Sequence, residues 1–140
     1  AQSHVRPEDL ARETLISYPV DRERLDIFKQ FLDPAGIEPA TLRTAEMTVM
    51  MMQLVASGRG VCCLPNWAMA EYLHKGYVSA RKLGPDGLFG TLYAAVREDM
   101  LEMSYLQDFL LTAKDTSFAT LEGPETYHQG GWLRPSALQF

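Results

Sequence analysis

Cysteine and long apolar runs are the two most informative shortages in this sequence. Its 140 residues include two cysteines, Cys62 and Cys63, which are neighbours in the chain. Vicinal cysteines rarely bridge, and without a spacer they do not chelate a metal as a C-x-x-C pair does. No apolar run approaches the roughly 20 residues of a transmembrane helix. These shortages argue against a disulfide framework, a cysteine-based metal site and a membrane span.

Positive charge is also scarce. Lys and Arg number 13 against 18 Asp and Glu, which gives a formal net charge of -5. Affinity for DNA depends on neutralising phosphates, so DNA-binding segments are more often basic. The first residues, AQSHVRPEDLARE, lack the apolar centre of a secretory signal peptide. We therefore expect a cytoplasmic chain that does not itself contact DNA.

The motifs of the common enzyme classes are missing as well. The sequence has no Gly-rich phosphate loop and no nucleophile elbow. Its three histidines are scattered, and both cysteines lie inside a predicted buried strand rather than at a strand end, where a nucleophile would be presented. We predict that the chain is not an enzyme and needs no cofactor or metal. A small cysteine-dependent enzyme is an alternative. A cysteine that reacts rapidly below pH 7 would support it.

Strand-like and helix-like segments alternate along the chain. The expected strands are 14–19, 40–46, 60–65, 77–83 and 90–98, and the expected helices are 22–32, 48–57, 67–75 and 99–114. Such alternation is typical of an α/β fold with a mostly parallel sheet and flanking helices. The periodicity ends near Thr116, so we predict a folded domain at 1–116 and an irregular C-terminal tail at 117–140.

Two of these segments have the composition of fully buried elements. The predicted helix 48–57 is apolar nearly all round, with Gln53 its only long polar side chain. The predicted strand 60–65 is continuously apolar, as in a parallel strand that is covered on both faces. Thr48 and Asn66 stand where helix N-caps are expected, and Gly58 stands where a left-handed cap would end a helix.

Polar side chains collect at the turns where three predicted strands meet the helices that follow them. In open parallel sheets these turns share one edge, where ligands bind over helix N-termini. The candidate ligand-binding residues at these turns are Tyr18, Pro19, Glu46, Met47, Thr48, Pro65, Asn66 and Trp67.

These turns suit an amino acid. Helix N–H groups would take its carboxylate, Glu46 its ammonium, and Met47 with Trp67 its side chain. A purely structural interpretation stays open beside this one. In it, Thr48 and Asn66 only cap helices and Glu46 only favours a helix N-terminus. The methionines and Trp67 would then belong to the core or an interface.

The run MMQLVASGRGVCCLPNWA resembles the second effector subdomain of LysR-type transcriptional regulators. The matching residues are Leu54, Val55, Gly58, Gly60, Val61, Leu64 and Pro65. The segments LISYPVDRERLDIFKQFLDPAGIEP, LPNWA and LYAAVRE also resemble the branch of this family that activates methionine biosynthesis genes. The resemblance covers about residues 7–116. It implies one lobe of a two-lobed, periplasmic-binding-protein-like (type II) effector domain, so 1–116 would be a partial effector-binding domain.

The resemblance also implies an effector and partners. The effector would be homocysteine, bound between the two lobes and contacted in this lobe by the candidate residues above. The family assembles into dimers and tetramers, and it reads DNA through an N-terminal winged helix-turn-helix that is absent from this sequence. A periplasmic-type amino-acid-binding protein is the alternative. The upstream sequence would decide, because it would encode a helix-turn-helix in one case and a signal peptide in the other.

Overall fold

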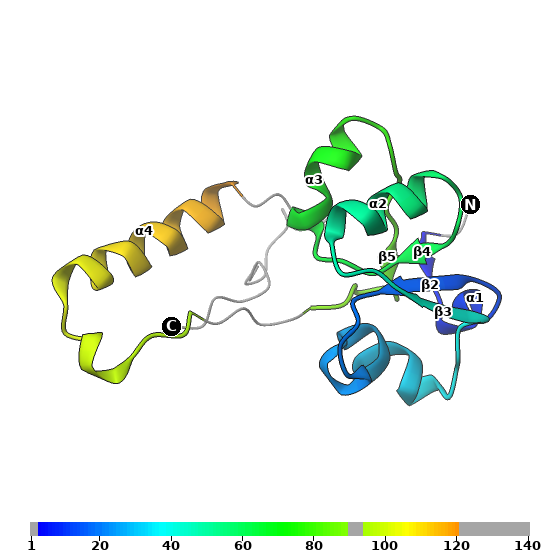
Figure 1. Ribbon diagram of the computed structural model, residues 1–140, viewed down its shortest axis with the longest axis horizontal. Coiled ribbons are helices and arrows are strands. Elements are labelled where there is room, and N and C mark those ends of the chain that lie inside the picture. The colour runs from blue at the N-terminus through cyan, green and yellow to red at the C-terminus, as the bar shows by residue number, and fades with distance from the viewer. Residues whose placement is uncertain (1–2, 90–93, 121–140) are drawn as a thin grey trace. The chain divides into compact units, whose positions relative to one another are not determined.

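The computed structural model describes residues 3–89 and 94–120, and the chain divides into two compact units, Ala1–Leu88 and Phe89–Phe140 (Figure 1). The elements of the first unit are β1 (His4–Val5), α1 (Pro7–Leu10), β2 (Thr14–Ser17), η1 (Arg22–Arg24), η2 (Ile27–Leu32), η3 (Asp33–Ala35), β3 (Thr41–Thr44), α2 (Thr48–Ala56), β4 (Val61–Cys62), α3 (Asn66–His74) and β5 (Lys82–Leu83). The second unit contains η4 (Glu98–Met100) and α4 (Ser104–Thr120).

All strand pairs of the first unit are parallel among the residues described. One sheet has the order β3-β2-β4, with Leu15 opposite both Leu42 and Val61. A second, two-stranded sheet pairs β1 with β5. Each connection within the larger sheet crosses over through helical segments. This arrangement confirms the predicted α/β fold with a mostly parallel sheet and flanking helices.

The core of the first unit lies on both faces of β2. Leu15 packs with Leu10, Ile27, Phe28 and Leu32 in one buried cluster. The next residue of the strand, Ile16, is fully buried and points to the opposite face, because successive side chains on a strand alternate. In Figure 1, α2 and α3 lie on one side of the sheet and the helical segment of η2 and η3 lies on the other.

The predicted helix 22–32 is a chain of shorter turns. η1 and η3 are 3-10 turns, and η2 between them is a π-helical turn. Pro34 has no backbone N–H, so it cannot donate the α-helical hydrogen bond to the carbonyl of Gln30. Gly36 then ends the segment with a φ of 65°, a left-handed conformation that glycine adopts easily.

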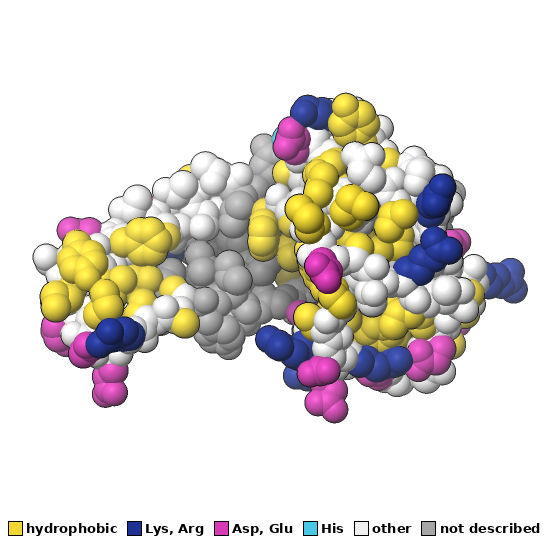
Figure 2. All heavy atoms as spheres, in the orientation of Figure 1, with side chains coloured by type: hydrophobic (Ala, Val, Ile, Leu, Met, Phe, Trp, Pro, Cys, Tyr) yellow, Lys and Arg dark blue, Asp and Glu magenta, His cyan; other side chains and the backbone are white. Residues whose placement is uncertain are grey.

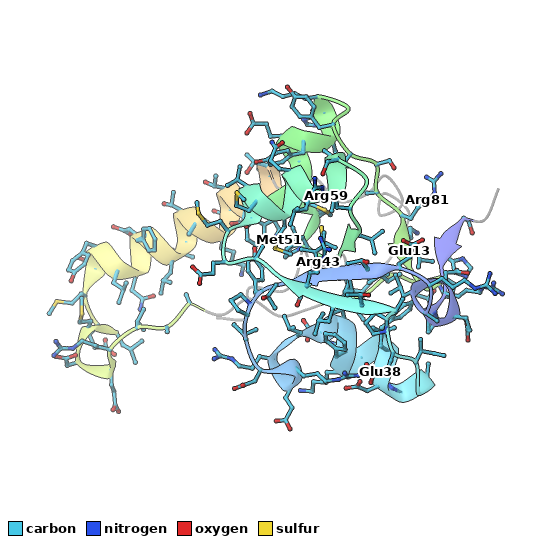
Figure 3. All side chains as sticks on the ribbon, turned by 45° about the vertical axis from the view of Figure 1, so that its right-hand side comes forward. Glu13, Glu38, Arg43, Met51, Arg59 and Arg81 are labelled. Atoms are coloured by element: carbon cyan, nitrogen blue, oxygen red, sulfur yellow. The ribbon has the colours of Figure 1, made fainter. Side chains whose placement is uncertain are left out.

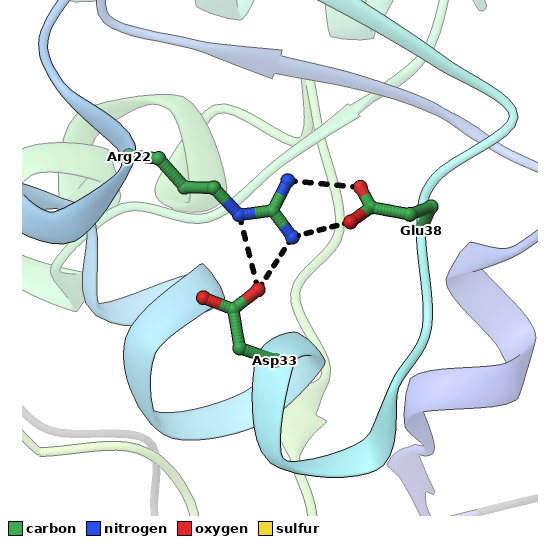
Figure 4. Close-up of polar contacts among 3 residues, drawn as sticks. All are labelled: Arg22, Asp33 and Glu38. Carbon is green, nitrogen blue, oxygen red and sulfur yellow. Dashed lines mark hydrogen bonds and ion pairs between the residues drawn. The ribbon is translucent and has the colours of Figure 1, made fainter.

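Arg22 holds this segment to the chain that follows it. Its guanidinium donates two hydrogen bonds to the Glu38 carboxylate, at 2.9 and 2.7 Å, and one of 3.0 Å from Nε to Asp33 (Figure 4). It also pairs with Asp33 through Nη2 and lies 4.2 Å from the centre of the Phe28 ring. These hydrogen bonds raise the pKa of Arg22, chiefly those to Glu38 and then those to Asp33.

The two segments predicted to be fully buried are only partly covered, so both predictions are wrong. On α2, Met51 and Met52 are buried (Figure 3 labels Met51), whereas Met50 is 53% exposed. A helix that packs on one face of a sheet of three strands buries only the side turned toward it. The predicted strand 60–65 is reduced to β4, which lies at the end of the strand order and is half-buried.

Several predicted boundaries also change. The strand 77–83 is reduced to β5, and residues 94–97 of the strand 90–98 are not in a strand, while 90–93 lie outside the described residues. The helix 99–114 begins at Ser104, after η4, and continues to Thr120. The first four residues of the predicted tail are therefore helical, and 121–140 lie outside the described residues. The left-handed cap at Gly58 is confirmed by a φ of 71°.

Candidate functional site

The starts of α2 and α3 border a shallow, open depression of about 600 Å³. Its lining residues are Glu46, Met47, Thr48, Val49, Trp67, Ala68 and Tyr72. Four of them, Glu46, Met47, Thr48 and Trp67, are among the residues singled out from the sequence. They meet here because β3 and β4 are parallel and their following turns reach the same end of the sheet.

Three lining residues were missed by the sequence argument. Val49 follows Thr48 directly, while Ala68 and Tyr72 lie on α3. For the last two the sequence contains a partial signal, because residues four apart share one face of a helix. This spacing predicts that Ala68 and Tyr72 lie on the same side of α3. It does not predict that this side faces the depression.

Thr48 is not the N-cap of its helix, so that prediction is wrong. Met47 occupies the N-cap position of α2 and Thr48 is the first helical residue. The Thr48 hydroxyl instead forms a hydrogen bond with the Tyr18 hydroxyl, with the two oxygens 2.6 Å apart. Thr48 thus connects the end of β2 to the start of α2 while it lines the depression.

The turn after β4 also differs from the expectation. Pro65 is the N-cap of α3, which begins at Asn66 and has no side-chain cap. The predicted capping role of Asn66 is therefore wrong. Pro65, Asn66, Pro19 and Tyr18 are not among the lining residues of this depression, and of these four Tyr18 is joined to it through Thr48.

The depression combines a polar rim with exposed apolar surface. Met47 is 59% exposed and Trp67 is 42% exposed, and Figure 2 shows hydrophobic side chains exposed over α2. Glu46 supplies a carboxylate, Thr48 a hydroxyl, and the first turns of α2 and α3 supply backbone N–H groups with no partner within their own helix. This set can bind a small zwitterion by its charged groups and an apolar or sulfur-containing side chain by dispersion.

The two cysteines do not have the properties of nucleophiles. Burial raises the pKa of Cys62 to about 11. The pKa of Cys63 rises to about 12, mainly through burial and further through the neighbouring Cys62 and Asp26. A reactive cysteine needs a lowered pKa and access to solvent. Both thiols are therefore protonated and poorly nucleophilic at neutral pH.

The described residues lack a metal-binding cluster and a membrane-spanning helix. Across 3–89 and 94–120, no three residues among His, Cys, Asp and Glu are grouped so that they could hold a metal ion. Within the same ranges, no helix is both long and apolar enough to cross a membrane.

Comparison with known proteins gives a family for the chain and several relatives. The LysR substrate binding domain family matches residues 1–117. The HTH-type transcriptional regulator MetR of Haemophilus influenzae is 49% identical over 116 residues, which cover 83% of this chain and 37% of that protein. MetR of Escherichia coli K12 is 39% identical over 115 residues, 82% of this chain and 36% of that protein. The chain thus spans little more than a third of these relatives.

A solved structure has the same fold. The regulatory domain of MetR from N. meningitidis, a LysR family regulator, superposes with a TM-score of 0.73 at 40% sequence identity. The match covers 87% of this chain and 56% of the solved one.

Proposed function

Since this chain belongs to the LysR family and is similar to the effector-binding domain of its MetR-type regulators, we propose that it senses homocysteine for a regulator of methionine biosynthesis. Homocysteine would bind between this lobe and a second lobe outside the chain. The observation that carries the proposal is the depression at the starts of α2 and α3, which collects Glu46, Met47, Thr48 and Trp67 at the sheet edge where ligands bind in this class of fold.

Each part of homocysteine would have a counterpart at this edge. The Glu46 carboxylate would accept the ammonium group, and Thr48 with the free N–H groups of α2 would bind the carboxylate. Met47 and Trp67 would contact the thiol-bearing side chain. Pro65, Asn66, Pro19 and Tyr18 would complete the site from the flanking turns, Tyr18 through its hydrogen bond to Thr48.

The proposed mechanism is a change in lobe closure. An effector that contacts both lobes binds the closed state more tightly, so it shifts the population toward that state. In a dimer or tetramer, closure would alter the spacing of the DNA-binding segments and hence transcription activation. DNA contact would come from a winged helix-turn-helix upstream of this sequence, which agrees with the net charge of -5.

Calorimetric titration of homocysteine tests this proposal. We expect binding by a two-lobed effector domain that includes this chain, and weaker binding or none by residues 1–140 alone. Glu46→Gln should weaken binding by about tenfold, because a hydrogen bond to a charged group is lost. Glu13→Gln is the matched control, since Glu13 is exposed and precedes β2, at the opposite end of that strand from Tyr18 (Figure 3). Absence of binding by the two-lobed protein would contradict the effector assignment.

A further inference from the structure

Tyr18 and Thr48 are joined by a hydrogen bond between their side chains. Tyr18 follows β2 and Thr48 opens α2, so the bond spans 30 residues of sequence. The two oxygens are 2.6 Å apart and the pair is partly buried. Thr48 lines the depression, whereas Tyr18 is not among its lining residues. Any effect of Tyr18 on a molecule in the depression would therefore pass through Thr48.

Either hydroxyl could donate this hydrogen bond, and the acidity of the two groups favours one direction. A hydroxyl group has one proton to donate and can accept hydrogen bonds on its oxygen. A phenol is a stronger acid than an aliphatic alcohol, so it is the better donor. With Tyr18 donating, the Thr48 oxygen accepts, and the Thr48 proton is left for an acceptor atom in the depression.

We infer that Tyr18 is a positioning residue, whose hydroxyl orients the Thr48 hydroxyl to donate to the carboxylate of an amino-acid effector. The inference rests on the proposed function and adds a specificity to it. Thr48 held in this way favours an acceptor atom of the ligand over a cationic group, which leaves the ammonium group to Glu46. The ligand would therefore lie with its carboxylate near Thr48 and its ammonium group near Glu46.

A double-mutant cycle on homocysteine affinity tests the inference, with the full-length regulator that contains this chain. Tyr18→Phe and Thr48→Val should each weaken binding by about fivefold, the value of one ordinary hydrogen bond. The double variant should bind no more weakly than Thr48→Val, because both substitutions remove the same interaction. Tyr77→Phe, at a tyrosine that is 61% exposed, is the control and should leave affinity unchanged.

A conservative variant separates positioning from general stability. Thr48→Ser keeps the hydroxyl, so adding Tyr18→Phe to it should again weaken binding about fivefold. Adding Tyr18→Phe to Thr48→Val should have no further effect. Unchanged affinity in Tyr18→Phe, or equal losses in both backgrounds, would overturn the inference.

Failure of the effector assignment gives a different result. If the unmodified regulator binds no homocysteine, the proposed effector is wrong. The four proteins of the double-mutant cycle, namely the unmodified regulator, the variants Tyr18→Phe and Thr48→Val, and the double variant, are then compared in urea unfolding. Non-additive changes in the free energy of unfolding would support the coupling of Tyr18 to Thr48, and additive changes would overturn it.

Discussion

At the scale of single residues, Gly60 is a position where the backbone leaves no room for a side chain. It precedes β4 with a φ of 151°, and a Cβ atom added there would lie 2.4 Å from the carbonyl oxygen of Thr14. Real Cβ atoms do not approach backbone that closely. The glycine therefore allows β4 to come close to β2 at the start of their pairing.

Gly60→Ala should lower the free energy of unfolding by about 2 kcal/mol, since either the strand pair or the backbone must shift. Gly58→Ala is the matched control. Gly58 also has a positive φ, of 71°, but a Cβ there would meet nothing within 4 Å. Gly58→Ala should lower the free energy of unfolding by about 1 kcal/mol, the cost of placing alanine in a left-handed conformation. Urea unfolding of both variants gives the comparison, and equal losses would contradict the close-approach argument.

The raised pKa values of the cysteines lead to a second prediction at this scale. With pKa values of about 11 and 12, Cys62 and Cys63 remain protonated in the folded chain at pH 8. Unfolding returns both toward the ordinary value of 9.0, which increases the thiolate fraction. A disulfide reagent should therefore react much faster with urea-unfolded than with native protein at pH 8. A native thiol that reacts at the unfolded rate would refute the structural role.

The same shifts predict how stability depends on pH. A thiol whose pKa is raised by folding contributes its full stabilisation below the unfolded value of 9.0. Above that pH the unfolded chain loses protons that the folded chain keeps, so stability falls as pH rises from 9 toward 12. Urea unfolding midpoints are measured from pH 8 to pH 12 for the unmodified chain and for Cys63→Ala, each relative to its own midpoint at pH 8. The midpoint should fall less steeply with pH in Cys63→Ala.

At the scale of elements, the segment between β2 and β3 depends on one arginine. Arg22 contacts Asp33, Glu38 and Phe28 together, and all three charged side chains are more than a third exposed. Exposed ion pairs contribute little singly. A planar guanidinium that is bidentate to Glu38 and donates from two nitrogens to one oxygen of Asp33 forms a network that lysine cannot reproduce.

Arg22→Lys should therefore lower the free energy of unfolding by about 0.5 kcal/mol. The difference should shrink in 1 M NaCl, because salt screens exposed charges. Arg24→Lys, in the same turn, is the control and should have a smaller effect. If the loss at Arg22 does not depend on salt, contact with the Phe28 ring rather than charge would explain it.

The secondary-structure elements agree with the sequence-based predictions in some places and differ in others. Alternating strand and helix patterns predicted the parallel sheet, and glycine predicted the left-handed turn at Gly58. The patterns failed on α2, because its composition reports apolar residues without saying how many neighbours exist to cover them. The Tyr18–Thr48 bond was not predictable either. It depends on how a strand end and a helix start 30 residues apart meet, which no local spacing encodes.

At the scale of the whole molecule, β3 is one of the two edge strands of the larger sheet, and it is the more exposed one. Within the described residues it pairs with β2 alone, and all four of its residues are exposed, including Leu42 at 49%. An edge strand with an exposed leucine and unpaired backbone groups favours association with another chain. This agrees with the dimers and tetramers that the resemblance to the family implies.

Leu42→Lys should shift the chain toward the monomer. Sedimentation velocity at several protein concentrations measures this, with Arg43→Lys as a control that keeps the charge of the strand. A lysine on an edge strand opposes pairing with a second edge. A monomer at every concentration in the unmodified chain would contradict the prediction, as would an unchanged association in Leu42→Lys.

The pairing of β1 with β5 has a mechanical consequence. The two strands are parallel, with His4 opposite Lys82, and they lie near the two ends of the first unit. Tension that pulls those ends apart acts at opposite ends of a parallel pair, so it loads the hydrogen bonds in shear and not one at a time. The larger sheet lies between these strands in the sequence. The β1–β5 pair therefore bears the load first, and no force is transmitted to β2, β3 and β4 until this pair separates.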